Sequence, residues 1–72
     1  MDNSIVKRCF ATVYTPSQRR KRFPENCVSV LASAEEAIAA AKQAKDTHPA
    51  KVMGPSRSSE GLRLYYLIEW LD

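Results

Sequence analysis

The amino-acid sequence predicts a small α+β domain, in which a mainly antiparallel sheet of three or four strands carries one α-helix on one face. A capped, alanine-rich segment in the middle of the chain predicts the helix. Segments rich in β-branched and aromatic residues before and after it predict the strands. The predicted order is β-β-α-(β)-β, and the length of 72 residues predicts a single domain that spans residues 1–72.

The composition is that of an ordinary globular protein, with 44% apolar and 26% charged residues. No apolar run approaches the ~20 residues that span a bilayer, and the N-terminus lacks the apolar core of a secretory signal. We therefore expect a cytoplasmic protein that makes no membrane contact. Cys9 and Cys27 lack the spacing of metal ligands, and we expect both to be reduced. A disulfide is the alternative, because pairing of the first two strands would allow the two cysteines to lie opposite each other.

The first half of the chain predicts two strands and a basic loop. Residues Ser4–Tyr14 are dense in β-branched and aromatic side chains, which is typical of a strand. Thr15–Pro24 is bounded by prolines and filled with polar and basic residues, so it predicts a loop. Glu25–Ala32 alternates between apolar and polar positions and predicts a second strand, antiparallel to the first.

The helix is predicted from Ala34 to about Thr47. The Ser33 side chain is expected to accept a hydrogen bond from the Glu36 amide, which caps the first turn. Pro49 disfavours helical angles at the residue before it and ends the helix. The only histidine, His48, is therefore expected at the helix C-terminus, where its protonated form suits the helix dipole, and not in a metal site.

The C-terminal part predicts a brief edge strand and a long final strand. Ala50–Met53 is the brief strand, which Gly54-Pro55 interrupts before a polar loop that extends to Gly61. Leu62–Leu71 has the strongest strand pattern, and its even positions form the face expected to lie under the helix: Leu62, Leu64, Tyr66, Ile68 and Trp70.

The odd positions of this last strand predict a protein interface. A single helix covers one face of a sheet, so Tyr65, Leu67 and Leu71 are expected to stay open to water. A homodimer is the simplest partner for such a face, and addition to another protein's sheet is a second form. The alternative is that loops, or Phe10 and Tyr14 of the first strand, cover these side chains within one chain.

Positive charge is concentrated near the N-terminus. Residues 1–24 carry six lysines and arginines and one aspartate, whereas residues 25–72 carry five basic and seven acidic residues. This distribution predicts a site for nucleic acid or another anion, because clustered arginines bind phosphate with two hydrogen bonds each and an aromatic ring stacks on an unpaired base. The residues expected in it are Arg19, Arg20, Lys21, Arg22, Phe23, Arg57 and Arg63. The alternative is a solvated loop without a ligand.

These patterns predict a non-enzymatic binding module. The sequence contains no motif that places a nucleophile beside a base, and no phosphate-binding glycine loop or metal-ligand spacing. We therefore expect no catalytic residue, metal, cofactor or small-molecule substrate. The expected partner is nucleic acid or an acidic protein that contacts the basic loop. A stoichiometric protein inhibitor or adaptor, which binds a protein partner through the last strand, is the alternative function.

Overall fold

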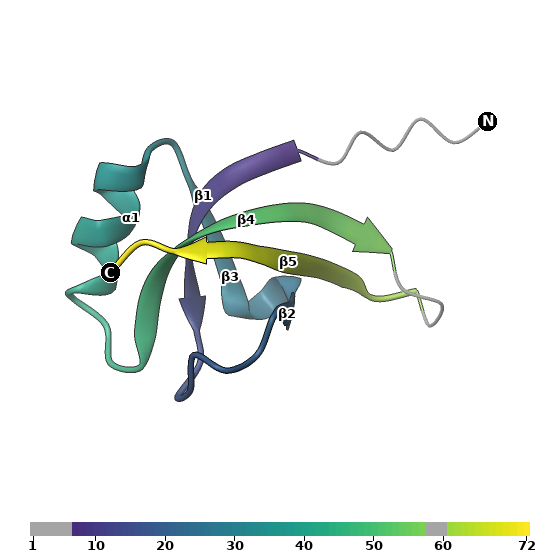
Figure 1. The fold of residues 1–72 in the computed structure, drawn as a ribbon, viewed down its shortest axis with the longest axis horizontal. Helices are drawn as coiled ribbons and strands as arrows, with labels where there is room; N and C mark the ends of the chain where they lie inside the picture. The colour runs from purple at the N-terminus through teal and green to yellow at the C-terminus, as the bar shows by residue number, and fades with distance from the viewer. Residues whose placement is uncertain (1–6, 58–60) are drawn as a thin grey trace.

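A computed structural model describes residues 7–57 and 61–72 and places them in one five-stranded antiparallel sheet with one α-helix (Figure 1). The α+β class is confirmed. The prediction of three or four strands missed a short strand inside the basic segment. The elements in chain order are β1 Lys7–Tyr14, β2 Arg22–Pro24, the 3₁₀ helix η1 Glu25–Cys27, β3 Val28–Leu31, α1 Ala34–Ala41, β4 Thr47–Arg57 and β5 Arg63–Trp70.

The sheet is coiled, because its two edge strands are consecutive in the chain. The strand order is β2-β5-β4-β1-β3, and only the three residues of η1 connect β2 to β3. Three residues reach at most about 10 Å, so the two edges lie close together. Figure 1 shows β3, η1 and β2 following one another behind the β4–β5 hairpin. The result is a barrel-like sheet with an inner face and an outer face.

The predicted antiparallel pairing of the first strand with the strand before the helix is confirmed between β1 and β3. Its register places Val28 opposite Val13, so Cys27 lies beside the C-terminal end of β1. Cys9 is about 16 Å farther along β1 by strand geometry, which is too far for a disulfide. Both cysteines are free. The predicted strand residues 4–6 lie outside the described residues.

The helix starts where the sequence predicts but ends earlier. The Ser33 hydroxyl accepts a hydrogen bond of 3.2 Å from the Glu36 amide, which confirms the N-cap. The helix ends at Ala41, so the prediction that it continues to about Thr47 is wrong. The chain tightens into 3₁₀-type turns after Ala41, and Asp46 adopts a φ of 57°, a left-handed conformation that aspartate tolerates and a helix does not. These turns direct the chain into β4.

Strand β4 is central in the sheet, and the prediction of a brief edge strand at residues 50–53 is wrong. It pairs with β1 on one side and with β5 on the other. Pro49 fits in this strand because the Pro49 carbonyl accepts a hydrogen bond of 2.9 Å from the Leu71 amide. The nitrogen and the carbonyl of a strand residue point to the same side. The missing N–H of Pro49 therefore faces the end of β5, where no β1 hydrogen bond is lost.

Two bulges shift the pairing between β4 and β5. Gly54 and Pro55 together lie opposite Tyr65, and Ile68 is an extra residue between the pairs Val52–Leu67 and Lys51–Glu69. The sequence predicted that Gly54-Pro55 ends the strand, but these two residues form a bulge within the continuous strand β4. Residues 58–60 of the predicted loop lie outside the described residues.

The core fills the inner face of the coiled sheet. Its buried cluster consists of Ala11, Val13, Phe23, Ala50, Val52 and Tyr65, with Cys9, Val28, Leu67 and Trp70 packed against it. The helix packs against β1, β3 and β4 and buries Ala37 and Ala41 outside this cluster. Small residues at the centre of β1 and β4 leave room for the two large rings, Phe23 and Tyr65.

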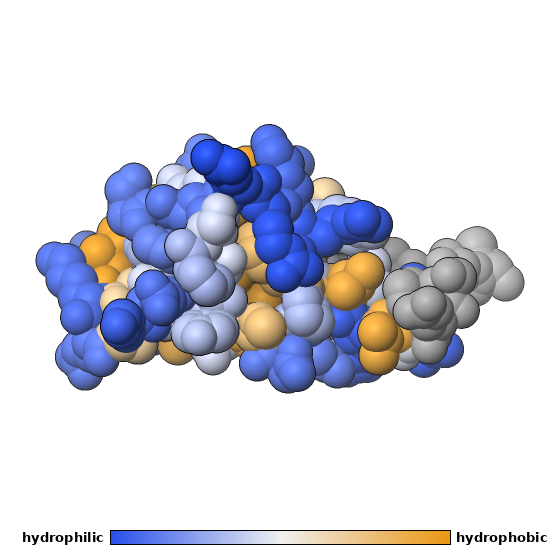
Figure 2. Space-filling view, turned by 90° about the horizontal axis from the view of Figure 1, so that it is seen from below, coloured by the Kyte–Doolittle hydropathy of each residue, from blue (hydrophilic) through white to orange (hydrophobic). Residues whose placement is uncertain are grey.

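The face assignment predicted for the last strand is wrong. Tyr65 is 9% exposed, whereas Tyr66 is 36% and Ile68 40% exposed. Leu67 and Leu71 are half-buried. The predicted interface at Tyr65, Leu67 and Leu71 is therefore mostly occupied by the core of the same chain, because the sheet coils around its odd face. Figure 2 shows one face of the molecule, on which separate apolar areas are surrounded by hydrophilic residues.

Candidate anion-binding surface

Residues Thr15–Pro24 contain the clustered cations, and the turn before β4 fixes the backbone at the start of this segment. The Thr15 amide donates a hydrogen bond of 2.8 Å to the Asp46 carbonyl. The buried Thr15 hydroxyl donates to the Ser17 carbonyl at 2.6 Å, and the Arg19 amide donates to the Ser17 hydroxyl at 3.3 Å. Thr15 and Ser17 therefore hold the backbone of the chain that leads into Arg19.

The last strand fixes the rest of the segment. The Trp70 indole donates a hydrogen bond of 3.2 Å to the Gln18 carbonyl, and the Gln18 amide side chain donates to Asp72 at 3.1 Å. The Leu67 amide donates to the Lys21 carbonyl at 2.8 Å. These contacts lie directly before and after Arg19 and Arg20. The cationic loop is therefore held by its backbone.

The side chains of this loop face solvent. Arg19, Arg20, Lys21 and Arg22, which we name the basic loop, are all exposed. Among the described residues, none of the four forms an ion pair with a carboxylate. Four neighbouring cations that form no ion pair within the described part of the chain concentrate positive potential over one short segment. An anion would therefore meet four exposed cations on a fixed backbone.

Phe23 does not belong to this surface. It is 1% exposed, and its ring lies 5.8 Å from the Trp70 ring in an edge-to-face arrangement. The predicted role of Phe23 in stacking on a base is therefore wrong, since no base reaches a ring enclosed in the core. The Arg20 guanidinium lies 5.8 Å from the Phe23 ring centroid, so the loop rests against the edge of the core.

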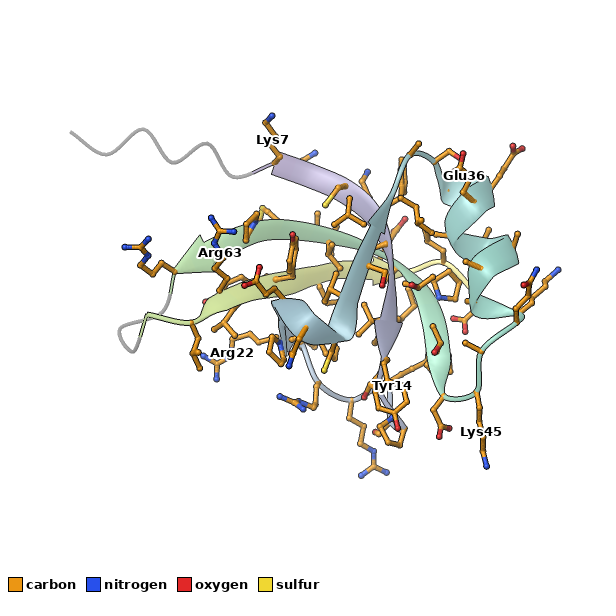
Figure 3. The ribbon with its side chains drawn as sticks, turned by 180° about the vertical axis from the view of Figure 1, so that it is seen from behind. Lys7, Tyr14, Arg22, Glu36, Lys45 and Arg63 are labelled. Atoms are coloured by element: carbon orange, nitrogen blue, oxygen red, sulfur yellow. The ribbon has the colours of Figure 1, made fainter. Side chains whose placement is uncertain are left out.

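The structure separates the predicted arginines into two groups. Arg57 and Arg63 pair at the loop end of the β4–β5 hairpin, and Arg63 also lies 3.7 Å from the Glu25 carboxylate in an exposed ion pair. Arg63 is two residues from Tyr65 in β5, so both side chains lie on the same face of the sheet, and Arg57 shares this face because it pairs with Arg63. Arg22 pairs with Tyr66 and therefore lies on the opposite face. Figure 3 shows Arg22 and Arg63 in the half of the molecule opposite α1.

Strand register brings together a set of residues of which the sequence predicted only Arg22 as part of a site. Arg22 pairs with Tyr66, Tyr66 pairs with Met53, and Met53 pairs with Arg8, across β2, β5, β4 and β1. Directly paired residues share a face, so all four project outward in one line, which we name the outer row. Arg22, Tyr66 and Arg8 are exposed, and Met53 is half-buried. Only the order of the strands reveals this row, because its members are far apart in the chain.

His48 and Asp72 form a polar contact at the end of the inner face. His48 lies in β4, so its predicted place at the helix C-terminus is wrong. Its Nδ1 is 3.1 Å from the Asp72 carboxylate, and its ring packs edge-to-face on Trp70 at 5.8 Å. The His48 hydrogen bond is the main cause that lowers the pKa of Asp72, with partial burial opposing it and Gln18 adding to it. This contact helps to hold the basic loop, because Asp72 also binds Gln18.

Burial affects two other ionisable groups. It raises the pKa of the Cys9 thiol, and it is the main cause that raises the pKa of the Tyr65 hydroxyl. Both groups therefore stay protonated at neutral pH. In the described part of the chain, no cluster of three or more His, Cys, Asp or Glu side chains forms a metal site.

Among residues 7–57 and 61–72, no helix combines the length and the apolar character that a membrane crossing requires. Comparisons of the chain with models of protein families, with curated proteins and with solved structures found no match.

Proposed function

We propose that this protein is a non-enzymatic binding module that contacts the phosphates of a nucleic acid through the basic loop. The observation that carries the proposal is that hydrogen bonds from Trp70 to Gln18 and from Leu67 to Lys21 fix the backbone at the basic loop. The four cations of the loop form no ion pair among the described residues. A loop held in this way loses little conformational freedom on binding. Arginine suits phosphate because its planar fork makes two parallel hydrogen bonds. The proposal keeps the cytoplasmic location expected from the sequence.

The number of cations sets the expected strength and salt dependence. If all four cations of the basic loop contact phosphates, log affinity falls with log salt with a slope of about −2.8 for a single strand. A fourfold rise in salt then weakens binding roughly 50-fold. Such a module binds weakly as one chain, and a homodimer, which remains a prediction, would double the contacts.

Salt-dependent binding by loop variants tests the proposal. We expect the double variant Arg19→Ala/Arg20→Ala to reduce the magnitude of the salt slope by about 1.4 in fluorescence anisotropy titrations with labelled oligonucleotides. The matched control is Lys42→Ala/Lys45→Ala, which removes the same charge from exposed positions after the helix. The control should bind as the unchanged protein does.

Two outcomes would contradict the proposal. One is that neither DNA nor RNA binds at low salt. The other is that the two double variants weaken binding equally, because the effect would then follow net charge and not the loop. Polyglutamate of similar charge is the third ligand in the same titration. Binding of polyglutamate as tight as that of nucleic acid would favour an acidic protein as the partner.

A protein inhibitor or adaptor remains the alternative function, but its surface must differ from the one predicted. A partner that docks on the last strand would meet the outward side chains Leu62, Tyr66 and Ile68, which are exposed. Light scattering at high concentration tests the homodimer, and copurification from the native cell tests another protein partner.

A further inference from the structure

We infer that the outer row binds a single-stranded nucleic acid, with one base stacked on Tyr66 and phosphates at Arg22 and Arg8. The inference rests on the proposed function and specifies its ligand as single-stranded. It also adds a second contact surface to the basic loop. The surface lies on the sheet, where strand pairing fixes the backbone of every member.

The geometry of the outer row fits a chain that alternates bases and phosphates. Neighbouring strands in a sheet are about 4.8 Å apart, so Arg22 and Arg8 are separated by about 14 Å at their backbones. Tyr66 and Met53 lie between them on the two central strands, β5 and β4. An apolar platform flanked by one cation on each side therefore runs across four strands.

The chemistry of the platform suits a base. Tyr66 is 36% exposed, so part of its ring is open to a ligand. Base–aromatic stacking tolerates every base, because each has a π-face, and the neighbouring Met53 thioether adds a polarizable contact. The next pair toward the helix joins Lys51 to Glu69, which adds no net charge to the platform.

The basic loop leads directly into the outer row. Arg22 belongs to both, since it is the last cation of the loop and the first residue of β2. The Lys21 carbonyl is bonded to the Leu67 amide, next to Tyr66 in the chain. A single strand that follows the cations of the loop therefore reaches Tyr66 without a gap in positive charge.

The same geometry disfavours a duplex. Bases in a double helix are stacked on one another, so their faces are closed to a side chain on a protein surface. A duplex would contact only the arginines. The outer row therefore predicts a preference for single strands, and this preference should depend on the ring of Tyr66.

Paired ligands test the stacking contact separately from the charge contact. One is a labelled single strand of about 12 nucleotides. The other is an abasic strand of the same length and charge. We expect Tyr66→Ala to weaken binding of the base-bearing strand by at least about fivefold, the lower limit for one stacked base. Binding of the abasic strand should not change, and Tyr66→Phe should bind both as the unchanged protein does.

The controls distinguish the failure of this inference from that of the proposed function. The double variant Arg19→Ala/Arg20→Ala should weaken binding of the base-bearing strand and of the abasic strand by the same factor. If it does so while Tyr66→Ala changes neither, the loop binds phosphate and the inference about the outer row is wrong. If neither ligand binds to any variant, the proposed function is wrong. Tyr14 is a second exposed aromatic, about 20 Å along β1 from Arg8. A loss on Tyr14→Ala in place of Tyr66→Ala would place the base elsewhere and overturn the inference.

Discussion

The inner and outer faces of the β2–β5 strand pair use adjacent residues for opposite purposes. On the inner face, Phe23 lies opposite Tyr65, and both rings are buried. On the outer face, one residue away on each strand, Arg22 lies opposite Tyr66, and both are exposed. Two neighbouring tyrosines therefore have different surroundings because strand side chains alternate. One residue of register decides which aromatic ring stabilises the fold and which one faces solvent.

The largest expected effect is on the inner face. Phe23→Ala removes a large ring from the core and should lower the free energy of unfolding by about 3–5 kcal/mol. For a chain of this length the total is only about 4–11 kcal/mol, so much of the variant is expected to be unfolded on warming. Urea unfolding followed by circular dichroism measures the change.

Tyr66→Ala is the matched substitution on the outer face. It should change the free energy of unfolding by less than about 1 kcal/mol, because the ring is already partly in water. If the two substitutions lower the free energy of unfolding by similar amounts, Tyr66 stabilises the fold as much as Phe23 does. The proposal that the outer row is a ligand surface would then be wrong.

An effect smaller than that of Phe23→Ala is expected at the bulge that sets the register of these faces. Gly54 has a φ of 146°, and a Cβ there would lie 2.9 Å from the Leu64 carbonyl oxygen and 3.2 Å from the Tyr65 ring. Gly54→Ala should therefore lower the free energy of unfolding by about 1–3 kcal/mol. Thermal unfolding measures this loss.

Gly61→Ala is the control for the bulge, because Gly61 also has a positive φ, 85°, but its added Cβ meets no described atom within 4 Å outside its chain neighbours. The difference between the two variants in the free energy of unfolding measures the cost of the close contact between β4 and β5 at Gly54. Equal losses would show that backbone conformation alone matters at Gly54.

The sequence predicted the features of the fold that local residues determine. The N-cap at Ser33, the pairing of β1 with β3 and the strand character of the last segment depend on capping, propensity and alternation, which act over a few residues. The helix end was missed because Lys42 and Lys45 favour a helix locally, whereas the pairing of β4 with β1 begins at Thr47. Tertiary pairing overrode helix propensity there.

Long-range register was beyond the sequence patterns. Both faces of the last strand carry large apolar side chains, so alternation alone does not identify the buried one. The bulge at Ile68 then turns Leu67 and Trp70 to the same side, which a strict two-residue period forbids. β2 is only three residues long and has no period to detect. The basic loop was predictable from its composition, but the outer row required the order of four strands.

The smallest expected effect lies where the inner face meets the basic loop. Because the His48 hydrogen bond is the main cause that lowers the pKa of Asp72, His48→Ala should raise that pKa toward its ordinary value of 3.8, as measured by NMR of the Asp72 carboxyl. A carboxyl whose folded-state pKa is lowered contributes stability above its unfolded pKa and loses it as pH falls through the folded value. The unchanged protein should therefore lose slightly more stability than His48→Ala below about pH 4, by about 0.2–1 kcal/mol for an exposed pair. An unchanged Asp72 pKa in His48→Ala would show that Gln18 alone holds the carboxylate. The contact between the inner face and the loop would then depend on Trp70 and Gln18 and not on the histidine.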